Sequence, residues 1–195
     1  NHENIVTVYH VDSLQGCSFL LMEYVDGCDL AEWMAEHKPW QSPQQLSDVL
    51  AIIGQICRAL DYAHKQGVVH RDVKPANVLV SADGRVKLSD FGLAKLVRRD
   101  VGQEELTATG DRMGTEAYMA PEQRGNARSV DHRADVYSAG VMLYEMLTGQ
   151  LPVGNVGTPL RQARVESRLQ GIVLKALESA PERRFQTAGQ LHAAL

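Results

Sequence analysis

The chain of 195 residues lacks several features that would set its class at once. It has three cysteines, Cys17, Cys28 and Cys57, which are scattered and odd in number, so neither a disulfide framework nor a paired zinc site is indicated. Its 24 acidic side chains outnumber the 20 basic ones, giving a net charge of −4, which argues against nucleic-acid binding by bulk positive charge. No apolar run approaches the roughly 18 residues of a membrane span. These 195 residues also show no signal-peptide pattern, internal repeat or low-complexity tract.

The hydrophobic pattern predicts strands in the first part of the chain and mostly helices afterwards. The expected strands are residues 5–9, 18–25, 78–80 and 86–88, with turns at 13–17 and 81–85. The expected helices are residues 29–36, 42–66, 134–147, a stretch around 169–177, and a last one from 187 to the chain end. Residues 95–116 show little periodicity, so they are predicted to form a long functional loop.

The clearest predicted helix begins after Ser42 and ends near Gln66. Ser42 is a favoured N-cap, Pro43 suits the first helical position, and Gln45 completes a capping-box pattern. Gly67 stands where a C-terminal glycine is expected. Six apolar residues recur at three- and four-residue steps and are expected in the core: Leu46, Val49, Leu50, Ile53, Cys57 and Leu60.

Three polar clusters lie after predicted strands or close the long loop, where functional residues usually gather. They are residues 70–77 (HRDVKPAN), 90–92 (DFG) and 120–122 (APE). A hairpin returns its ends to proximity, so Asn77 and Asp90, which flank the predicted hairpin, are expected to meet. Two oxygen ligands suit Mg²⁺, which keeps most of its waters. Asp72 is then placed to orient a hydroxyl, and Lys74 to face the charge on a transferred phosphoryl group.

In order and spacing, the three clusters resemble the motif set of protein kinases, and the resemblance covers essentially the whole chain. Residues 74–77 are similar to the serine/threonine form of the catalytic loop, and residues 114–123 resemble the substrate-facing segment of bacterial eukaryotic-like kinases. The resemblance implies an α+β, protein kinase-like fold with a mainly helical C-lobe plus the last strands of the N-lobe. Residues 1–25 would be the remnant of the N-lobe, its fourth and fifth strands and the hinge. Residues 26–195 would be the C-lobe with the catalytic loop, the activation segment and the C-terminal helices.

The resemblance also implies ATP and Mg²⁺ as cofactors, with Mn²⁺ as a substitute, and protein substrates that carry Ser or Thr. Asp72 would orient the substrate hydroxyl and Lys74 would contact the γ-phosphate. Asn77 and Asp90 would hold the metal.

The same resemblance implies that residues 22–25 bind ATP, with Met22 as the gatekeeper. The backbone of Glu23 and Val25 would bond adenine, and Leu79 would floor its pocket. Asp29 lies where a ribose contact is expected, although a helix-capping role is equally consistent with its position.

Regulation is expected in the long loop. Arg71 before Asp72 is the arrangement of kinases that activation-loop phosphorylation controls, and Thr107 and Thr109 lie at the offset that bacterial relatives phosphorylate. The alternative is that both are solvated loop hydroxyls. Self-association would serve phosphorylation of one copy by another.

Supporting roles are implied for four more residues. Thr115 would help to position the catalytic aspartate, Asp135 would brace the catalytic loop, and Glu122 would form a structural ion pair with Arg184. His70 is expected to be a packed residue and not a base.

The sequence departs from the family at its start. It contains no G-x-G-x-x-G loop, and the third-strand lysine and its glutamate partner are missing as well, since these precede the position of Asn1 in the family. The chain alone is therefore expected to be weak or inactive. Two rivals stay open: a truncated pseudokinase that serves as a scaffold, and a small-molecule phosphotransferase. The expected location of the kinase domain is the cytoplasm, with a membrane anchor elsewhere in the full-length protein.

Overall fold

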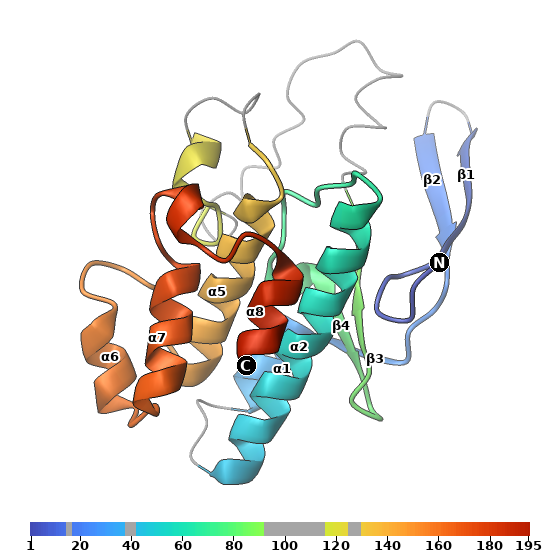
Figure 1. Cartoon of the computed structure of the whole chain (residues 1–195). Helices are drawn as coiled ribbons and strands as arrows, with labels where there is room; N and C mark the ends of the chain where they lie inside the picture. The colour runs from blue at the N-terminus through green and yellow to red at the C-terminus, as the bar shows by residue number, and fades with distance from the viewer. Residues whose placement is uncertain (15–16, 38–41, 92–115, 125–129) are drawn as a thin grey trace.

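The computed structural model describes residues 1–14, 17–37, 42–91, 116–124 and 130–195 (Figure 1). Strands β1 (Val8–Leu14) and β2 (Cys17–Met22) form an antiparallel hairpin. Strands β3 (Gly27–Asp29), β4 (Val78–Ser81) and β5 (Val86–Leu88) form an antiparallel sheet in the order β3-β4-β5. Figure 1 shows the β1–β2 hairpin at one side of the molecule and the helices grouped at the other.

Helices make up most of the remainder. They are α1 (Leu30–Glu36), α2 (Pro43–Lys65), α5 (Arg133–Thr148), α6 (Gly157–Gln162), α7 (Ser167–Ala176) and α8 (Ala188–Ala194), with short 3₁₀ turns at Pro75–Asn77, Pro121–Arg124 and Pro181–Arg183. Helix α5 packs against both α2 and α7, and α8 packs along α2. In the part of the chain that the structure describes, no helix is long and apolar enough to cross a membrane.

Helix α2 forms for the reasons that its sequence indicates. The hydroxyl of Ser42 accepts a hydrogen bond from the Gln45 amide at 3.2 Å, so the predicted cap is confirmed. Of the six predicted core residues, four are buried, while Leu46 and Leu50 are only partly buried. Ile52 and Ile56 are buried instead, because α2 packs against both β5 and the helices α5 and α8, which buries more than one stripe.

Two predictions about the strands were wrong. The first strand covers residues 8–14 and not 5–9, because Ile5 and Val6 bond to Leu88 of β5 and so lie along the edge of the other sheet. The three-residue strand β3 was missed, since Gly27–Asp29 has little strand propensity and is a strand only through its pairing with β4. A Cβ on Gly27 would lie 2.1 Å from the Val80 carbonyl oxygen, so only glycine allows this pairing.

Helix α6 was not predicted either, because its six residues include a glycine and a proline. The predicted helix 29–36 is α1, which begins at residue 30 with Asp29 as its N-cap. Most of the predicted loop 95–116 lies outside the described residues.

Candidate active site

The buried carboxylate of Asp135, in the first turn of α5, anchors the polar segment 70–77. Its Oδ2 accepts the His70 amide at 2.8 Å, and its Oδ1 accepts the Arg71 amide at 2.8 Å. Oδ2 also lies 2.8 Å from Nε2 of His64, which is at the end of α2. The predicted bracing role of Asp135 thus has a physical basis, since one carboxylate that is 1% exposed ties α2, α5 and the loop together. The contact of His64 with Asp135 was not predicted. His64 lies four residues after the buried Leu60, and this spacing places both on the same face of α2.

His70 is buried between the loop and the end of β5. Its Nε2 lies 2.7 Å from the Ser89 carbonyl oxygen, and its Nδ1 lies 3.3 Å from the Asp72 amide. A carbonyl only accepts and an amide only donates, so the ring follows the pattern of a neutral imidazole protonated at Nε2. The ring also packs on Phe91 with centroids 4.6 Å apart. Both ring nitrogens are engaged in holding the loop, which agrees with the predicted packing role.

The carboxylate of Asp72 is held by its two polar neighbours on the loop. Nδ2 of Asn77 donates to the Asp72 carbonyl at 2.7 Å and to Oδ2 at 3.1 Å. Nζ of Lys74 lies 3.2 Å from the same Oδ2. The Asp72 side chain keeps 43% of its surface exposed, whereas Asn77 is 7% exposed. A fixed carboxylate that faces solvent is suited to orient an incoming hydroxyl.

The hairpin of β4 and β5 brings Asn77 and Asp90 to one end, as predicted. Val78 pairs with Leu88, and the next residue, Ser89, joins the two groups. Its amide donates to the Asn77 carbonyl at 2.9 Å, and its hydroxyl contacts that carbonyl and Oδ2 of Asp90, at 3.2 Å each.

These groups fit a divalent cation such as Mg²⁺. Nδ2 of Asn77 is turned to Asp72, so its Oδ1 remains as an acceptor, and the Asp90 carboxylate is exposed. Among the described residues no three His, Cys, Asp or Glu side chains cluster as a metal cage. Two oxygen donors without a full cage are what Mg²⁺ needs, since it keeps several waters and binds phosphates.

Two residues of this region have left-handed backbone, which side chains disfavour. Arg71 has φ of 68° and Asp90 has φ of 60°. Such conformations cost free energy and cluster at functional sites, where the surrounding contacts enforce them. Both residues lie in the clusters that the sequence singled out.

The predicted adenine-contacting residues lie at the end of β2 and on β4. Oε1 of Glu23 accepts the Thr7 amide at 3.0 Å and pairs with Nζ of Lys87 at 2.7 Å. Burial raises the pKa of Glu23, but these two partners outweigh it and hold the pKa below its ordinary value. The Glu23 side chain is therefore structural, and Val25 and Leu79 are partly buried.

Asp29 acts as a cap in the structure. Its Oδ1 accepts the Glu32 amide at 2.9 Å at the start of α1. Its ribose contact stays a prediction.

Comparisons with known proteins identify the family. Residues 1–190 match the family model described as protein kinase domain. The chain belongs to the protein kinase family.

Relatives among curated kinases extend this result. The chain is 38% identical over 215 residues to "Serine/threonine-protein kinase PknB" of Mycobacterium leprae, a match that covers 100% of this chain and 33% of the relative. It is 37% identical to "Serine/threonine-protein kinase Pkn1" of Myxococcus xanthus, with 100% and 29% covered. The chain thus spans about a third of the length of the curated relatives it matches.

A solved kinase domain has the same fold. The kinase domain of PknI from Mycobacterium tuberculosis superposes with a TM-score of 0.76 at 30% identity, covering 100% of this chain and 71% of that one. The predicted α+β kinase fold is confirmed.

At the C-terminal end of the kinase activation segment, Glu122 and Arg184 form the predicted ion pair. The two guanidinium nitrogens Nη1 and Nη2 donate to the two carboxylate oxygens at 2.7 and 2.8 Å. Arg184 is 2% exposed, and it also donates to the carbonyls of Glu178, Ser179 and Arg133. Because all three guanidinium nitrogens donate hydrogen bonds, this buried charge is compensated.

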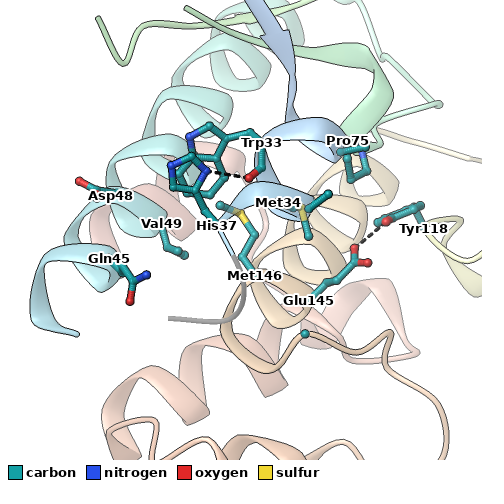
Figure 2. Close-up of a pocket in the computed structure, with 13 residues that line it drawn as sticks. Trp33, Met34, His37, Gln45, Asp48, Val49, Pro75, Tyr118, Glu145 and Met146 are labelled. Atoms are coloured by element: carbon teal, nitrogen blue, oxygen red, sulfur yellow. Dashed lines mark hydrogen bonds between the residues drawn. The ribbon is translucent and has the colours of Figure 1, made fainter. Parts of the chain in front are cut away.

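Tyr118 ties the same segment to α5, a contact that the sequence did not reveal. Its hydroxyl donates to Oε2 of Glu145 at 2.5 Å, and its carbonyl accepts from the Ser138 hydroxyl at 2.8 Å. Burial and the neighbouring carboxylate raise the pKa of Tyr118 far above its ordinary value. A cavity of about 410 Å³ lies between α1, α2 and α5. Figure 2 shows the Tyr118–Glu145 pair on one side of it and the stacked rings of Trp33 and His37 on the other.

Three predicted residues cannot be placed. Thr107, Thr109 and Thr115 lie outside the described residues, and so does most of the activation segment.

Proposed function

We propose that the chain carries the phosphoryl-transfer machinery of a serine/threonine protein kinase, which moves the γ-phosphoryl group of ATP to Ser or Thr hydroxyls of proteins. One observation carries the proposal: the solvent-facing Asp72 carboxylate is fixed by Asn77 and Lys74 beside the hairpin that brings Asp90 to the same end. The family match and the names of the curated relatives support it.

The chemistry follows from these positions. The substrate oxygen forms a bond to the γ-phosphorus while the bond from that phosphorus to the β–γ bridging oxygen breaks, and the hydroxyl proton goes to Asp72. Lys74 neutralises charge on the transferred group. Asn77 and Asp90 would hold Mg²⁺, or Mn²⁺ in its place, which when bound neutralises the phosphates.

The nucleotide would lie between the hinge and the sheet. We assign adenine contacts to the backbone of Glu23 and Val25 and to the side chain of Leu79. Asp29 would touch the ribose through Oδ2, since Oδ1 caps α1. Residues 1–25 would then be the N-lobe part and residues 26–195 the C-lobe.

Regulation by a phosphate on Thr107 or Thr109 is part of the proposal, with Arg71 as the receptor. Nε of Arg71 is buried without a hydrogen-bond partner among the described residues, and its Nη2 reaches only the Val130 carbonyl, at 3.4 Å. A phosphate would supply the acceptors that this guanidinium lacks. The proposal includes phosphorylation of one copy by another and a supporting role of Thr115 for Asp72. It also includes a cytoplasmic kinase domain, with a membrane anchor elsewhere in the whole protein.

The proposal favours an enzyme over a scaffold. No observation on the described residues favours the pseudokinase alternative, because the groups around Asp72 and Asp90 keep the contacts that catalysis requires. Protein substrates are favoured over small molecules by the family match and by the buried Glu122–Arg184 pair that supports the substrate-facing segment.

The test is phosphorylation of a Ser/Thr protein by the complete natural protein with ATP and Mg²⁺. Replacing Asp72 by Asn keeps the size of the side chain but removes the proton acceptor, so the rate should fall by about 10²-fold or more. Asp83→Asn is the matched control, because Asp83 lies in the exposed β4–β5 turn and should leave the rate unchanged. Equal phosphate incorporation by the wild type and Asp72→Asn would refute the assignment.

A further inference from the structure

The outer edge of β5 is closed by a side chain from α2. One edge of this strand pairs with β4, and among the described residues the other edge has a backbone partner only at Leu88, which bridges to Ile5. Oε1 of Gln55 accepts the Val86 amide at 2.9 Å, and Nε2 of Gln55 donates to the Gly84 carbonyl at 2.9 Å. The carboxamide thus takes the place of a peptide group on a neighbouring strand.

Asn4 continues the closure along the same edge. Its side chain is almost fully buried, and Nδ2 donates to Oε1 of Gln55 at 3.0 Å and to the Val86 carbonyl at 2.9 Å. Its own carbonyl accepts the Leu88 amide at 2.9 Å, and the Leu88 carbonyl accepts the Val6 amide at 3.0 Å. Two carboxamides and a short backbone segment therefore fix β5 from end to end.

Strand β5 leads directly to Asp90. Only Ser89 separates Leu88 from Asp90, and Asp90 has left-handed backbone. The Asp90 side chain is exposed, and its carboxylate accepts one hydrogen bond from a described side chain, the Ser89 hydroxyl. The place of the Asp90 carboxylate is thus set chiefly by where β5 ends. A strand that slid or frayed at its outer edge would move this carboxylate relative to Asn77.

We propose that Gln55 and Asn4 are positioning residues for the metal-binding carboxylate of Asp90, and that they couple α2 and the N-terminal segment to the metal site. This inference rests on the proposed function, which makes Asp90 a metal ligand. A purely stabilising role explains Asn4 poorly, because its Oδ1 is buried with no hydrogen-bond partner among the described residues. A buried polar atom without a partner lowers stability. We therefore explain the side-chain amide of Asn4 by the groups that its Nδ2 holds in place, Gln55 and the Val86 carbonyl.

The experiment compares Gln55→Leu with Gln44→Leu in the complete natural protein. Both residues are glutamines of α2, but Gln44 bonds only to Asp48 among the described residues, on the helix surface. The first measurement is the Mg²⁺ concentration that half-saturates binding of a fluorescent ATP analogue. The second is hydrogen exchange of the Val86 amide.

Gln55→Leu should raise the half-saturating Mg²⁺ concentration about five- to tenfold and speed Val86 exchange about tenfold, because it removes the three hydrogen bonds to Val86, Gly84 and Asn4. Binding of the analogue without Mg²⁺ should stay within about twofold, because that binding does not use Asp90; a general loss of structure would weaken it too. Gln44→Leu should leave all three values unchanged.

Two further variants make every outcome decisive. Gln55→Glu keeps the acceptor for Val86 and Asn4 and replaces the donor to the Gly84 carbonyl by a carboxylate oxygen at a solvent-exposed position, so it is expected to disturb the fold less than Gln55→Leu. It should raise the half-saturating Mg²⁺ concentration about two- to threefold. Asp90→Asn tests the metal assignment itself.

If Asp90→Asn raises the Mg²⁺ requirement and neither Gln55 variant does, the positioning role is overturned and the proposed function stands. If Asp90→Asn has no effect either, the metal assignment in the proposed function is wrong. A rise with Gln55→Leu that is matched by equally weaker binding without Mg²⁺ would reduce Gln55 to a stabilising residue.

Discussion

Helix α5 and the β1–β2 hairpin are the two extremes of burial in this chain. Twelve of the sixteen residues of α5 are buried, including Asp135, whereas all seven residues of β1 are exposed. The groups proposed for phosphoryl transfer are held by networks that reach into α5 and α2. The backbone groups proposed for adenine, at Glu23 and Val25, follow the exposed hairpin. One half of the candidate site is therefore organised by the helical core, and the other half depends on a much less supported element.

The hairpin is also rich in apolar surface. Leu14 is 68% exposed and Leu21 is 57% exposed, and both belong to a two-stranded sheet that lies apart from the helical core. A two-stranded hairpin is marginally stable by itself. Stability in this chain should therefore be concentrated in the helical part, and mutations should report that difference.

The largest expected effect comes from removing the anchor of the catalytic loop. Asp135→Ala leaves the backbone amides of His70 and Arg71 and the ring of His64 without their acceptor, so the free energy of unfolding should fall by about 3–5 kcal/mol and kinase activity should be lost. Chemical denaturation and the phosphorylation assay measure the two effects. Asp131→Ala is the control, since the side chain of this nearby acid is 44% exposed and bonds to Arg133 without contacting the loop, so its removal should cost about 1 kcal/mol. If Asp135→Ala and Asp131→Ala lowered the free energy of unfolding by similar amounts, the special role of the buried Asp135 carboxylate would be contradicted.

A smaller effect, with a pH signature, is expected for Glu122. Burial raises the pKa of this carboxyl, but the bonds from Arg184 outweigh it, and the net pKa lies below the ordinary value of 4.5. A lowered folded pKa contributes stability that is present above pH 4.5 and disappears as the pH falls through the folded value. Glu122→Gln should therefore lower the unfolding free energy by about 2–3 kcal/mol at neutral pH, and this difference should shrink below pH 4.5.

Denaturation curves at several pH values would measure this difference. Glu182→Gln is the matched control, because Glu182 is exposed on the neighbouring 3₁₀ turn. A difference for Glu122→Gln that is independent of pH would mean that the ion pair is not its source.

The smallest effect should be seen in the hairpin. Leu14→Ala removes an exposed side chain, so it should change the unfolding free energy by less than about 0.5 kcal/mol. Leu143→Ala in α5, where the side chain is fully buried, should cost about 2–5 kcal/mol. Thermal and chemical unfolding of both variants in the complete protein would sharpen the comparison. A cost near 2 kcal/mol for Leu14→Ala would show that the hairpin is covered there.

The sequence predicts most of the helical part, because its signals there are local. The cap at Ser42 and the regular spacing of apolar residues in α2 can both be recognised from residues close together in the sequence. The kinase motifs are also local, so the clusters around Asp72 and Asp90 could be named before their geometry was known. The pairing of Glu122 with Arg184 came from the family resemblance and is present in the structure.

What could not be predicted depends on contacts between distant segments. Strand β3 exists only because β4 lies beside it, and the pairing of residues 5–6 with β5 shifted the first predicted strand. Gln55 was one polar residue on a helix, and nothing nearby in the chain indicates that its carboxamide closes a strand. The roles of Thr107, Thr109 and Thr115 stay predictions, since these residues lie outside the described part of the chain.

The Asp135 carboxylate also sets an order of events when the chain is made on the ribosome. His70 leaves the ribosome 65 residues before Asp135 does, so the loop that carries Asp72 is synthesised well before its anchor. Until α5 emerges, the amides of the loop have no carboxylate to bind, and the loop has no reason to adopt its final form. The candidate site therefore assembles only after helix α5 has been added.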